Sequence, residues 1–399
     1  MSKQKKPIWQ YPWSYRESFL LVAGIGVATL AADLINSTKI GFPVFPLNII
    51  LLAIVILMIF SVHQLKKKFK LLKFFSSIPA AIGAISLFML MTIIMALTPE
   101  EVLMKIGLPS IRNSFTYYFS FFYLLLTLGA TTLKRFRFKT LNDWGFLLNH
   151  LGLWLFLAAS GFGAGDTKTG FMTLTPNTPE WRAQLESGQI EDLDFAVKLV
   201  NFKIDYHEPK FMLFDTKTEK IYKDKGKSVI IDLEHGRKYR WNNNEIAKVK
   251  INNSQLFTSE RYLVNQVVSF IKVKTPKGEI VSGPVTSGND IMPPLFLKIN
   301  DKLSIGTPKP EPSKFASKVR IYTKSGRIGD KTIEVNKPCT INGWRVYQNN
   351  WRYDYMNMQY ISILQVVRDP WMPYVYMACV LLTAGSLIMI FTNKLFRNR

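Results

Sequence analysis

Residues 147–162 have the sequence LLNHLGLWLFLAASGF, which places His150 inside an apolar run. An ionisable imidazole in hydrocarbon is costly unless it has a partner, so in a membrane helix it marks a functional position. The run leads directly into a long polar segment, residues 166–370. We expect the partner of His150 to be a metal ion.

Six apolar runs are each about long enough to cross a bilayer as a helix, which takes roughly 17 to 25 residues. The polar segment between the fifth and sixth runs is large enough for a core of its own. The sequence therefore predicts a membrane protein with six transmembrane helices and a large domain inserted between helices five and six. We expect an N-terminal membrane domain (1–165), the inserted domain (166–370) and a C-terminal helix with its tail (371–399). The six runs are residues 19–34, 45–62, 78–97, 117–133, 144–162 and 373–391.

The formal net charge of +23 is concentrated beside these runs. Basic residues gather at the N-terminus, at 66–73, at 134–139 and in the tail from Lys394, whereas the alternate loops hold only Lys39, Lys105 and Arg112. This asymmetry is the positive-inside pattern, and it predicts that both termini are cytoplasmic. With six spans, the inserted domain is then extracytoplasmic. We expect a lipid bilayer, and no nucleic acid, to be the partner of these charges.

The inserted domain shows strand signals with little helical periodicity. Phe202, Ile204 and Tyr206 alternate with polar residues, as do the apolar residues of 247–251, which is typical of a sheet with one solvated face. The sequence TPKG at 275–278 separates two strand-like runs and predicts a hairpin. We expect a mostly antiparallel sandwich or barrel, with residues 181–190 as its one short helix.

Cysteine chemistry and hydrolase motifs are both missing from the sequence. Cys339 falls in the inserted domain and Cys379 in the last apolar run, with no CxxC anywhere. This excludes thiol–disulfide exchange by the chain alone. Neither a nucleophile elbow nor a HExxH motif is present. We expect the inserted domain to dock a partner without covalent chemistry of its own.

Two histidines lie toward the predicted cytoplasmic face. His63 ends the second run, and His150 lies on the order of 10 Å into the fifth. His63 is also compatible with an interfacial residue, and His150 with an imidazole bonded to a neighbouring helix. A neutral imidazole is a good axial ligand for haem iron. Trp154, four residues after His150, shares its helix face and is placed to pack against a ring. Asn149, Gly145 and Gly152 favour close helix packing.

Several short motifs occur in the order found in a known family. The fifth run contains His150-Leu151-Gly152, residues 343–348 have the sequence GWRVYQ, and residues 367–370 have VRDP just before the last run. With the large β-rich segment between the two helices, this order resembles the ResB (CcsB) family of cytochrome c biogenesis proteins. The resemblance extends over residues 149–391.

The resemblance implies a subunit of the System II cytochrome c maturation complex of the bacterial inner membrane, which carries haem b across and presents it to apocytochrome c. The family's haem-ligating histidine matches His150, so the resemblance implies that His150 is an axial ligand of the iron. The second ligand is then His63 or a histidine of a partner protein, with Trp154 beside the ring. The resemblance implies that this haem is transient or transported.

The chain departs from the family pattern in two respects. Members usually have three helices before the outer domain, whereas five are predicted here, which leaves the role of His63 open. The Trp-rich motif of the partner protein CcsA, WGxxWxWD, does not occur in this sequence. The resemblance therefore implies a separate CcsA-type partner, and a subunit of a cytochrome c synthase (haem lyase) complex rather than a complete enzyme.

Two other functions are compatible with the same residues. A b-type electron-transfer membrane protein would use His63 and His150 to hold a permanent haem, although electron transfer across the whole bilayer normally takes two or more histidine pairs. A membrane scaffold without haem would bind an outer partner through its β-rich domain. The visible spectrum separates these possibilities, because the scaffold would show no Soret band.

Overall fold

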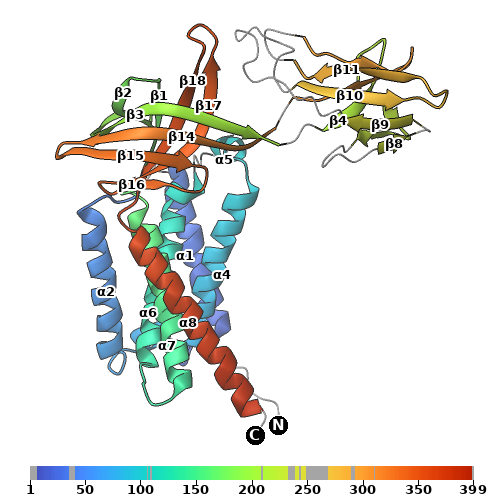
Figure 1. The fold of residues 1–399 in the computed structure, drawn as a ribbon. Helices are drawn as coiled ribbons and strands as arrows, with labels where there is room; N and C mark the ends of the chain where they lie inside the picture. Colours follow the sequence, from blue (N-terminus) through green and yellow to red (C-terminus); the bar gives the residue numbers. More distant parts are fainter. Residues whose placement is uncertain are drawn as a thin grey trace. The chain divides into compact units, whose positions relative to one another are not determined.

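The chain is organised in two compact units, both visible in Figure 1. The helical unit contains Met1–Gly170, Gly343–Arg345 and Val367–Arg399, and the β unit contains Phe171–Asn342 and Val346–Val366. The computed structural model describes residues 7–35, 41–105, 107, 110–207, 210–231, 239–241, 244–248, 268–288, 293–309 and 311–397.

Long apolar helices, joined by the short helices α3 (Lys70–Phe75) and α5 (Glu100–Lys105) and the 3-10 turn η1 (Ile111–Asn113), make up the helical unit. Polar side chains satisfy the free backbone N–H groups at several helix starts. Ser77 accepts from the backbone of α4, and Thr140 and Asp143 form a capping box at α7. The long helices are α1 (Tyr15–Ile35), α2 (Leu47–Leu65), α4 (Ile78–Leu97), α6 (Phe115–Lys134), α7 (Leu141–Gly163) and α8 (Met372–Arg397).

Five helices within the described residues are long and apolar enough to cross a membrane: α1, α2, α4, α7 and the Met372–Thr392 part of α8. All five coincide with runs predicted from the sequence, which indicates a multi-pass membrane protein. The predicted fourth span also forms a helix, α6, but this helix does not reach the same apolarity. Six spans are therefore not confirmed.

Helix α6 is less apolar than the five candidate spans, and it packs against four other helices: α1, α2, α4 and α7. Ser120, Leu125 and Thr127 on this helix are completely shielded. The Thr127 hydroxyl donates to the Tyr123 carbonyl oxygen at 3.0 Å, which satisfies it within the helix. Polar side chains are tolerated in a helix surrounded by other helices, where a lipid-facing helix would need apolar ones.

Asp33 on α1 caps the start of α6. Its Oδ1 accepts from the Phe115 backbone N–H at 2.6 Å, and its Oδ2 accepts from the backbone N–H of Thr116 at 3.1 Å and from the Thr116 hydroxyl at 2.8 Å. A carboxylate at a helix N-terminus is favourable because unpaired N–H groups and the helix dipole converge there. The buried acid thus fixes the ends of two helices against each other.

Helices α7 and α8 approach each other closely at glycines. A Cβ atom on Gly152 would lie 2.8 Å from the backbone nitrogen of Leu382, and one on Gly145 would lie 2.8 Å from Cγ of Met389. Asn149 donates from Nδ2 to the Ser386 hydroxyl at 2.8 Å. Small residues allow such close approach between membrane helices. The packing role predicted for Asn149 and its two neighbouring glycines is confirmed.

The larger sheet of the β-rich part has eight strands in the order β15-β14-β3-β2-β1-β18-β17-β16. The pairs β2–β3, β3–β14 and β14–β15 are antiparallel, as predicted for this part of the chain. The strands are β1 (Lys168–Leu174), β2 (Pro179–Leu185), β3 (Ile190–Tyr206), β14 (Pro312–Thr323), β15 (Gly326–Glu334), β16 (Cys339–Ile341), β17 (Trp344–Asp354) and β18 (Gln359–Arg368).

This sheet curls, because side chains from distant strands meet inside it. Ser317 of β14 donates to Oε1 of Gln348 on β17 at 2.6 Å and lies 2.7 Å from the Ser362 hydroxyl on β18. Phe202 of β3 also lies against Tyr360 of β18, with 5.4 Å between ring centroids. Strands that are not neighbours in the order can touch only if the sheet bends over on itself.

A smaller sandwich forms from two four-stranded sheets, ordered β12-β13-β4-β7 and β11-β10-β9-β8. Both contribute to one apolar core that contains Phe211, Leu213, Ile246, Ile271 and Ile305. Strands β5 (Lys223–Asp224) and β6 (Lys227–Ser228) form a separate pair. The sandwich strands are β4 (Phe211–Asp215), β7 (Ile230–Ile231), β8 (Tyr239–Trp241), β9 (Asn244–Lys248), β10 (Val268–Lys274), β11 (Ile280–Thr286), β12 (Leu297–Lys298) and β13 (Leu303–Gly306).

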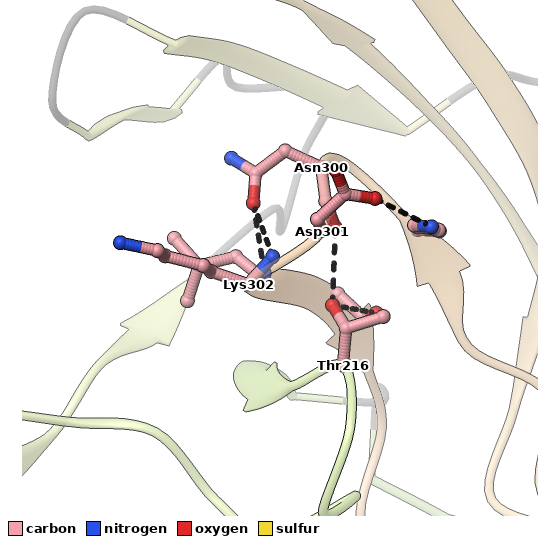
Figure 2. Close-up of polar contacts among 7 residues, drawn as sticks. Thr216, Asn300, Asp301 and Lys302 are labelled. Carbon is pink, nitrogen blue, oxygen red and sulfur yellow. Dashed lines mark hydrogen bonds and ion pairs between the residues drawn. The ribbon is translucent and has the colours of Figure 1, made fainter.

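Figure 2 shows how side chains close the turn between β12 and β13. Oδ1 of Asn300 accepts from the backbone N–H of Lys302 at 2.9 Å, and the Thr216 hydroxyl donates to the Asn300 carbonyl at 3.1 Å. Asp301 pairs with Lys298 at 2.9 Å on the exposed surface. The contacts of Asn300 and Asp301 stabilise the turn itself, and the bond from Thr216, which directly follows β4, holds the turn against the neighbouring strand.

The hairpin predicted around residues 275–278 is confirmed. Strands β10 and β11 pair antiparallel with Lys274 opposite Ile280, and Gly278 takes the positive φ of 83° that the turn requires. The predicted strand at 247–251 forms in its first two residues, in β9, and residues 249–251 lie outside the described part.

The helix predicted at 181–190 is wrong. Residues Pro179–Leu185 form strand β2, which turns at Gly188 (φ 85°) and pairs with β3. Ala183, Gln184 and Leu185 favour helix by intrinsic propensity. Ala183 is fully buried in the sheet. Propensities are weak, so pairing and burial in the tertiary structure override them here.

Candidate functional site

His150 lies on α7, nine residues after the helix begins at Leu141. Its Nδ1 lies 2.9 Å from the carbonyl oxygen of Phe146, one turn earlier. The same two residues stack their rings, with centroids 3.8 Å apart and planes at 30°. The imidazole is therefore held in one orientation by its own helix.

This hydrogen bond fixes the tautomer of His150. A carbonyl oxygen only accepts, so Nδ1 carries the proton and Nε2 keeps its lone pair. Metal-ligating histidines commonly donate their second N–H to a backbone carbonyl in this way. The side chain thus fits the role of an axial ligand to haem iron.

A positive charge lies close to this stacked pair. The guanidinium carbon of Arg135, which follows α6, is 5.1 Å from the centroid of the Phe146 ring. Arg135, Phe146 and His150 thus form a continuous series from the end of α6 to the interior of α7. Sequence reasoning did not identify Arg135 or Phe146, although Phe146 precedes His150 by the four residues of one helical turn.

Trp154 lies between α7 and α6. Its indole N–H donates to the carbonyl oxygen of Leu125 at 3.1 Å, and its ring packs beside a buried apolar cluster that includes Leu125, Phe121 and Phe162. This position shows how the residue anchors α7 to α6. Contact between Trp154 and a haem ring stays a prediction.

His63 is two residues before the end of α2. Its Nδ1 lies 3.1 Å from Nζ of Lys66. An ammonium group only donates, so Nδ1 accepts and the neutral ring carries its proton on Nε2. In this arrangement His63 has no free lone pair for a metal, whereas His150 has one.

The described residues do not combine the two histidines in one cluster. Neither a hydrogen bond nor a ring contact joins His63 to His150 within the described part of the chain, and no group of three or more His, Cys, Asp or Glu side chains there is arranged to hold a metal ion. Each of the two histidines is instead engaged by a residue of its own segment, His63 by Lys66 and His150 by Phe146.

A polar cluster around Asp166 was not identified from the sequence. Its Oδ2 accepts from Asn48 Nδ2 and from Trp371 Nε1, both at 2.7 Å, and its Oδ1 accepts from the Phe45 backbone N–H at 2.8 Å. Asn48 also donates to the Phe162 carbonyl oxygen at 3.0 Å. The cluster connects the start of α2, the end of α7 and the start of α8.

The hydrogen bonds control the charge of this carboxylate. Burial by itself raises the pKa of Asp166, but the bonds from Trp371, Phe45 and Asn48 outweigh it and hold the pKa below its usual value. The acid is therefore ionised at neutral pH. The only sequence signal was the position of Asp166 at the start of the polar segment, shortly after the fifth apolar run.

Apolar helices combined with an antiparallel β-rich unit define a membrane protein with an attached β domain. Residues 269–359, from β10 to the start of β18, match the model of the ResB-like family. This match supports the resemblance to the ResB (CcsB) family seen in the sequence, within the matched residues. The family suggests a subunit for cytochrome c biogenesis.

The matched segment contains none of the helices, so the role of His150 rests on its own geometry. A search of proteins with curated functions finds no match to this chain.

Proposed function

We propose that this chain is the ResB-type subunit of a System II cytochrome c maturation complex. It binds haem b within the membrane through His150 and helps to deliver it across to apocytochrome c. A separate CcsA-type membrane protein provides the rest of the haem-handling machinery.

The geometry of His150 carries this proposal. Its Nδ1 is engaged by the Phe146 carbonyl, which leaves Nε2 available as an axial ligand. At His63 the ring nitrogen Nδ1 accepts a hydrogen bond instead of donating one, so the ring has no free lone pair. This residue is therefore the weaker candidate for the second ligand. A histidine of the CcsA-type partner is therefore the second ligand in this proposal.

The charge pattern supports a location in the bacterial inner membrane. Basic residues lie at the end of the helical unit where α2 and α6 finish and α7 begins. By the positive-inside rule this end and both termini are cytoplasmic, and the β unit is extracytoplasmic. His150 then lies in the inner half of the bilayer, where haem made in the cytoplasm would enter.

Each part of the chain has a defined task in this scheme. Bound haem supplies the macrocycle that becomes joined to the client's cysteines through thioether bonds. His150 orients the haem iron, the apolar side chains of α6 and α7 exclude water, and the β unit holds the apocytochrome. The complex accelerates attachment by positioning the reactants.

Haem content and cytochrome c maturation test the proposal together. The full chain is co-expressed with its CcsA-type partner, purified in mild detergent, and its haem is measured from the Soret band. His150→Ala should lose most of the haem and most of the maturation activity. His207→Ala, at an exposed position in the β unit, removes the same kind of side chain and should retain both.

Added imidazole should partly restore haem in His150→Ala, because it occupies the vacant coordination position. Normal maturation in His150→Ala would refute the ligand role. Haem that is permanent, stoichiometric and independent of the partner would instead support electron transfer, and absence of any Soret band would support a scaffold.

A further inference from the structure

Four lysines surround one cavity in the helical unit. The cavity lies where the C-terminal ends of α2 and α6 come together. Lys66 and Lys67 follow α2, Lys73 lies on α3 and Lys134 ends α6. Together with Ser76 they line a cavity of about 290 Å³. No Asp or Glu is among these lining residues, so the cavity concentrates positive charge.

The positive charges in this cavity repel one another. Burial, together with the neighbouring charges of Lys134 and Lys67, holds the pKa of Lys66 below its usual value. Lys134 is held in place because its Nζ donates to the Ser76 carbonyl oxygen at 3.1 Å. Like charges gathered around a pocket cost free energy unless an anion occupies it.

Ser76 provides an independent indication of a ligand. Only 3% of this residue is exposed, and its hydroxyl has no hydrogen-bond partner within the described structure. Buried hydroxyl groups nearly always have a partner, so an unpaired one points to a missing acceptor. An anionic oxygen in the cavity would accept from the lysine ammonium groups and, once the Ser76 side chain rotates toward the cavity, from this hydroxyl as well.

The surroundings of the cavity are those of a membrane interface. Tyr11 lies beneath the ammonium groups of Lys70 and Lys73, at 5.9 and 5.8 Å from its ring centroid, and Trp13 packs against Phe74 at 5.1 Å. Such amphipathic rings prefer the level of the lipid headgroups. Phe69 and Leu71 nearby remain 55% and 48% exposed, which suits contact with acyl chains.

We propose that this lysine cavity binds the phosphate group of an anionic phospholipid. The lysines and Ser76 hold the headgroup, and the exposed Phe69 and Leu71 contact its acyl chains. Phosphate is the shared chemistry of a lipid headgroup and a free phosphate ion, and the apolar surface beside the lysines favours the lipid. This site is separate from the ligand role of His150 and does not depend on it.

Lipid selectivity measures this site directly. The full-length chain is reconstituted in phosphatidylcholine bilayers containing a trace of spin-labelled phosphatidylglycerol or spin-labelled phosphatidylcholine, and the immobilised fraction of each label gives their relative affinity. Wild type should prefer phosphatidylglycerol. The Lys66→Gln/Lys134→Gln variant should reduce this preference by about fivefold or more, since each lysine near an anionic surface contributes substantially.

The Lys68→Gln/Lys70→Gln variant is the matched control. It removes the same number of charges, both from the basic segment 66–73, without altering the residues that line the cavity, so it should reduce the preference much less. Ser76→Ala changes no charge and should also lower the preference, which separates headgroup recognition from general attraction. Circular dichroism confirms that each variant is folded.

Three outcomes would overturn the proposal. Equal losses in the two double variants would show a non-specific surface charge. Inorganic phosphate that displaces the bound label at millimolar concentration would show a free-phosphate site. Loss of co-purified haem without any change in lipid preference would assign the lysines to a different anion.

Discussion

The indole Nε1 of Trp371 donates a hydrogen bond of 2.7 Å to Oδ2 of Asp166, although 205 positions separate the two residues in the sequence. The bond joins the segment that follows α7 to the residue that precedes α8. Oδ1 of Asp369 accepts from the backbone N–H groups of Trp371 and Met372 at 2.9 and 3.1 Å, which caps α8. Asp369 of the VRDP motif therefore caps the start of α8, and Trp371, the next residue after the motif, fastens that helix to the end of α7.

Replacing Asp166 with Asn should destabilise the helical unit. The amide cannot accept all three hydrogen bonds that the carboxylate accepts, so we expect a loss of about 1–3 kcal/mol. Thermal unfolding in detergent, followed by circular dichroism, measures the change. Trp371→Phe keeps a ring but removes the donor, and should cost less. Glu186→Gln removes the same charge at an exposed turn, and an equal loss there would contradict the prediction.

The Asp166 cluster should also make stability depend on pH. Although burial opposes it, hydrogen bonding holds the folded-state pKa of Asp166 below the unfolded value of about 3.9. Its contribution is therefore fully present above about pH 4 and is lost as the pH falls through the folded-state pKa. The difference in unfolding temperature between wild type and Asp166→Asn should shrink below pH 4. A difference that stays constant with pH would exclude this linkage.

Within the proposed complex, His63→Ala should retain far more haem than His150→Ala. The Lys66 ammonium donates to Nδ1 of His63, whereas Nδ1 of His150 donates to Phe146 and leaves Nε2 free. Haem per protein, measured from the Soret band of the co-purified complex, distinguishes the two variants. Equal losses would mean that His63 releases Lys66 and provides the second axial ligand.

Reporter fusions test the proposed topology. A periplasmic alkaline phosphatase fused after Lys68 or after Lys139 should be inactive, because both sites follow basic segments that the positive-inside rule places in the cytoplasm. A fusion after Lys277, in the turn between β10 and β11, should be active. Activity after Lys68 would reverse the orientation of the helical unit, and with it the location assigned to the β unit.

Cys339→Ser should leave cytochrome c maturation almost unchanged. The thiol is free and partly buried, and burial raises its pKa despite the opposing charge of Lys331. Little reactive thiolate is then present at neutral pH. Maturation assays in cells, with protein levels checked by immunoblot, measure the effect. If maturation were lost while the protein remained folded and in the membrane, a thiol role would replace the docking role of the β unit.

Local sequence patterns were sufficient to predict where the long apolar helices and the β10–β11 hairpin form. Apolar runs of membrane length form helices because their backbone groups pair within the segment, so α1, α2, α4, α7 and α8 form where the sequence predicts. The turn at Gly278 is local for a different reason, since glycine adopts the positive φ that the turn requires without a steric cost. Residues 181–190 show the limit of this reasoning, because their pairing with β3 depends on residues far along the chain.

The sequence by itself determined that His150 is an ionisable residue in an apolar helix, and its motif order indicated the family. Only the tertiary structure decided which atom of His150 is free, because that depends on the Phe146 carbonyl lying 2.9 Å from Nδ1. The same holds for Asp166, whose partners Phe45, Asn48 and Trp371 come from distant segments. Hydropathy depends on each residue alone, whereas hydrogen bonds need two groups placed within about 3 Å, and folding creates that placement.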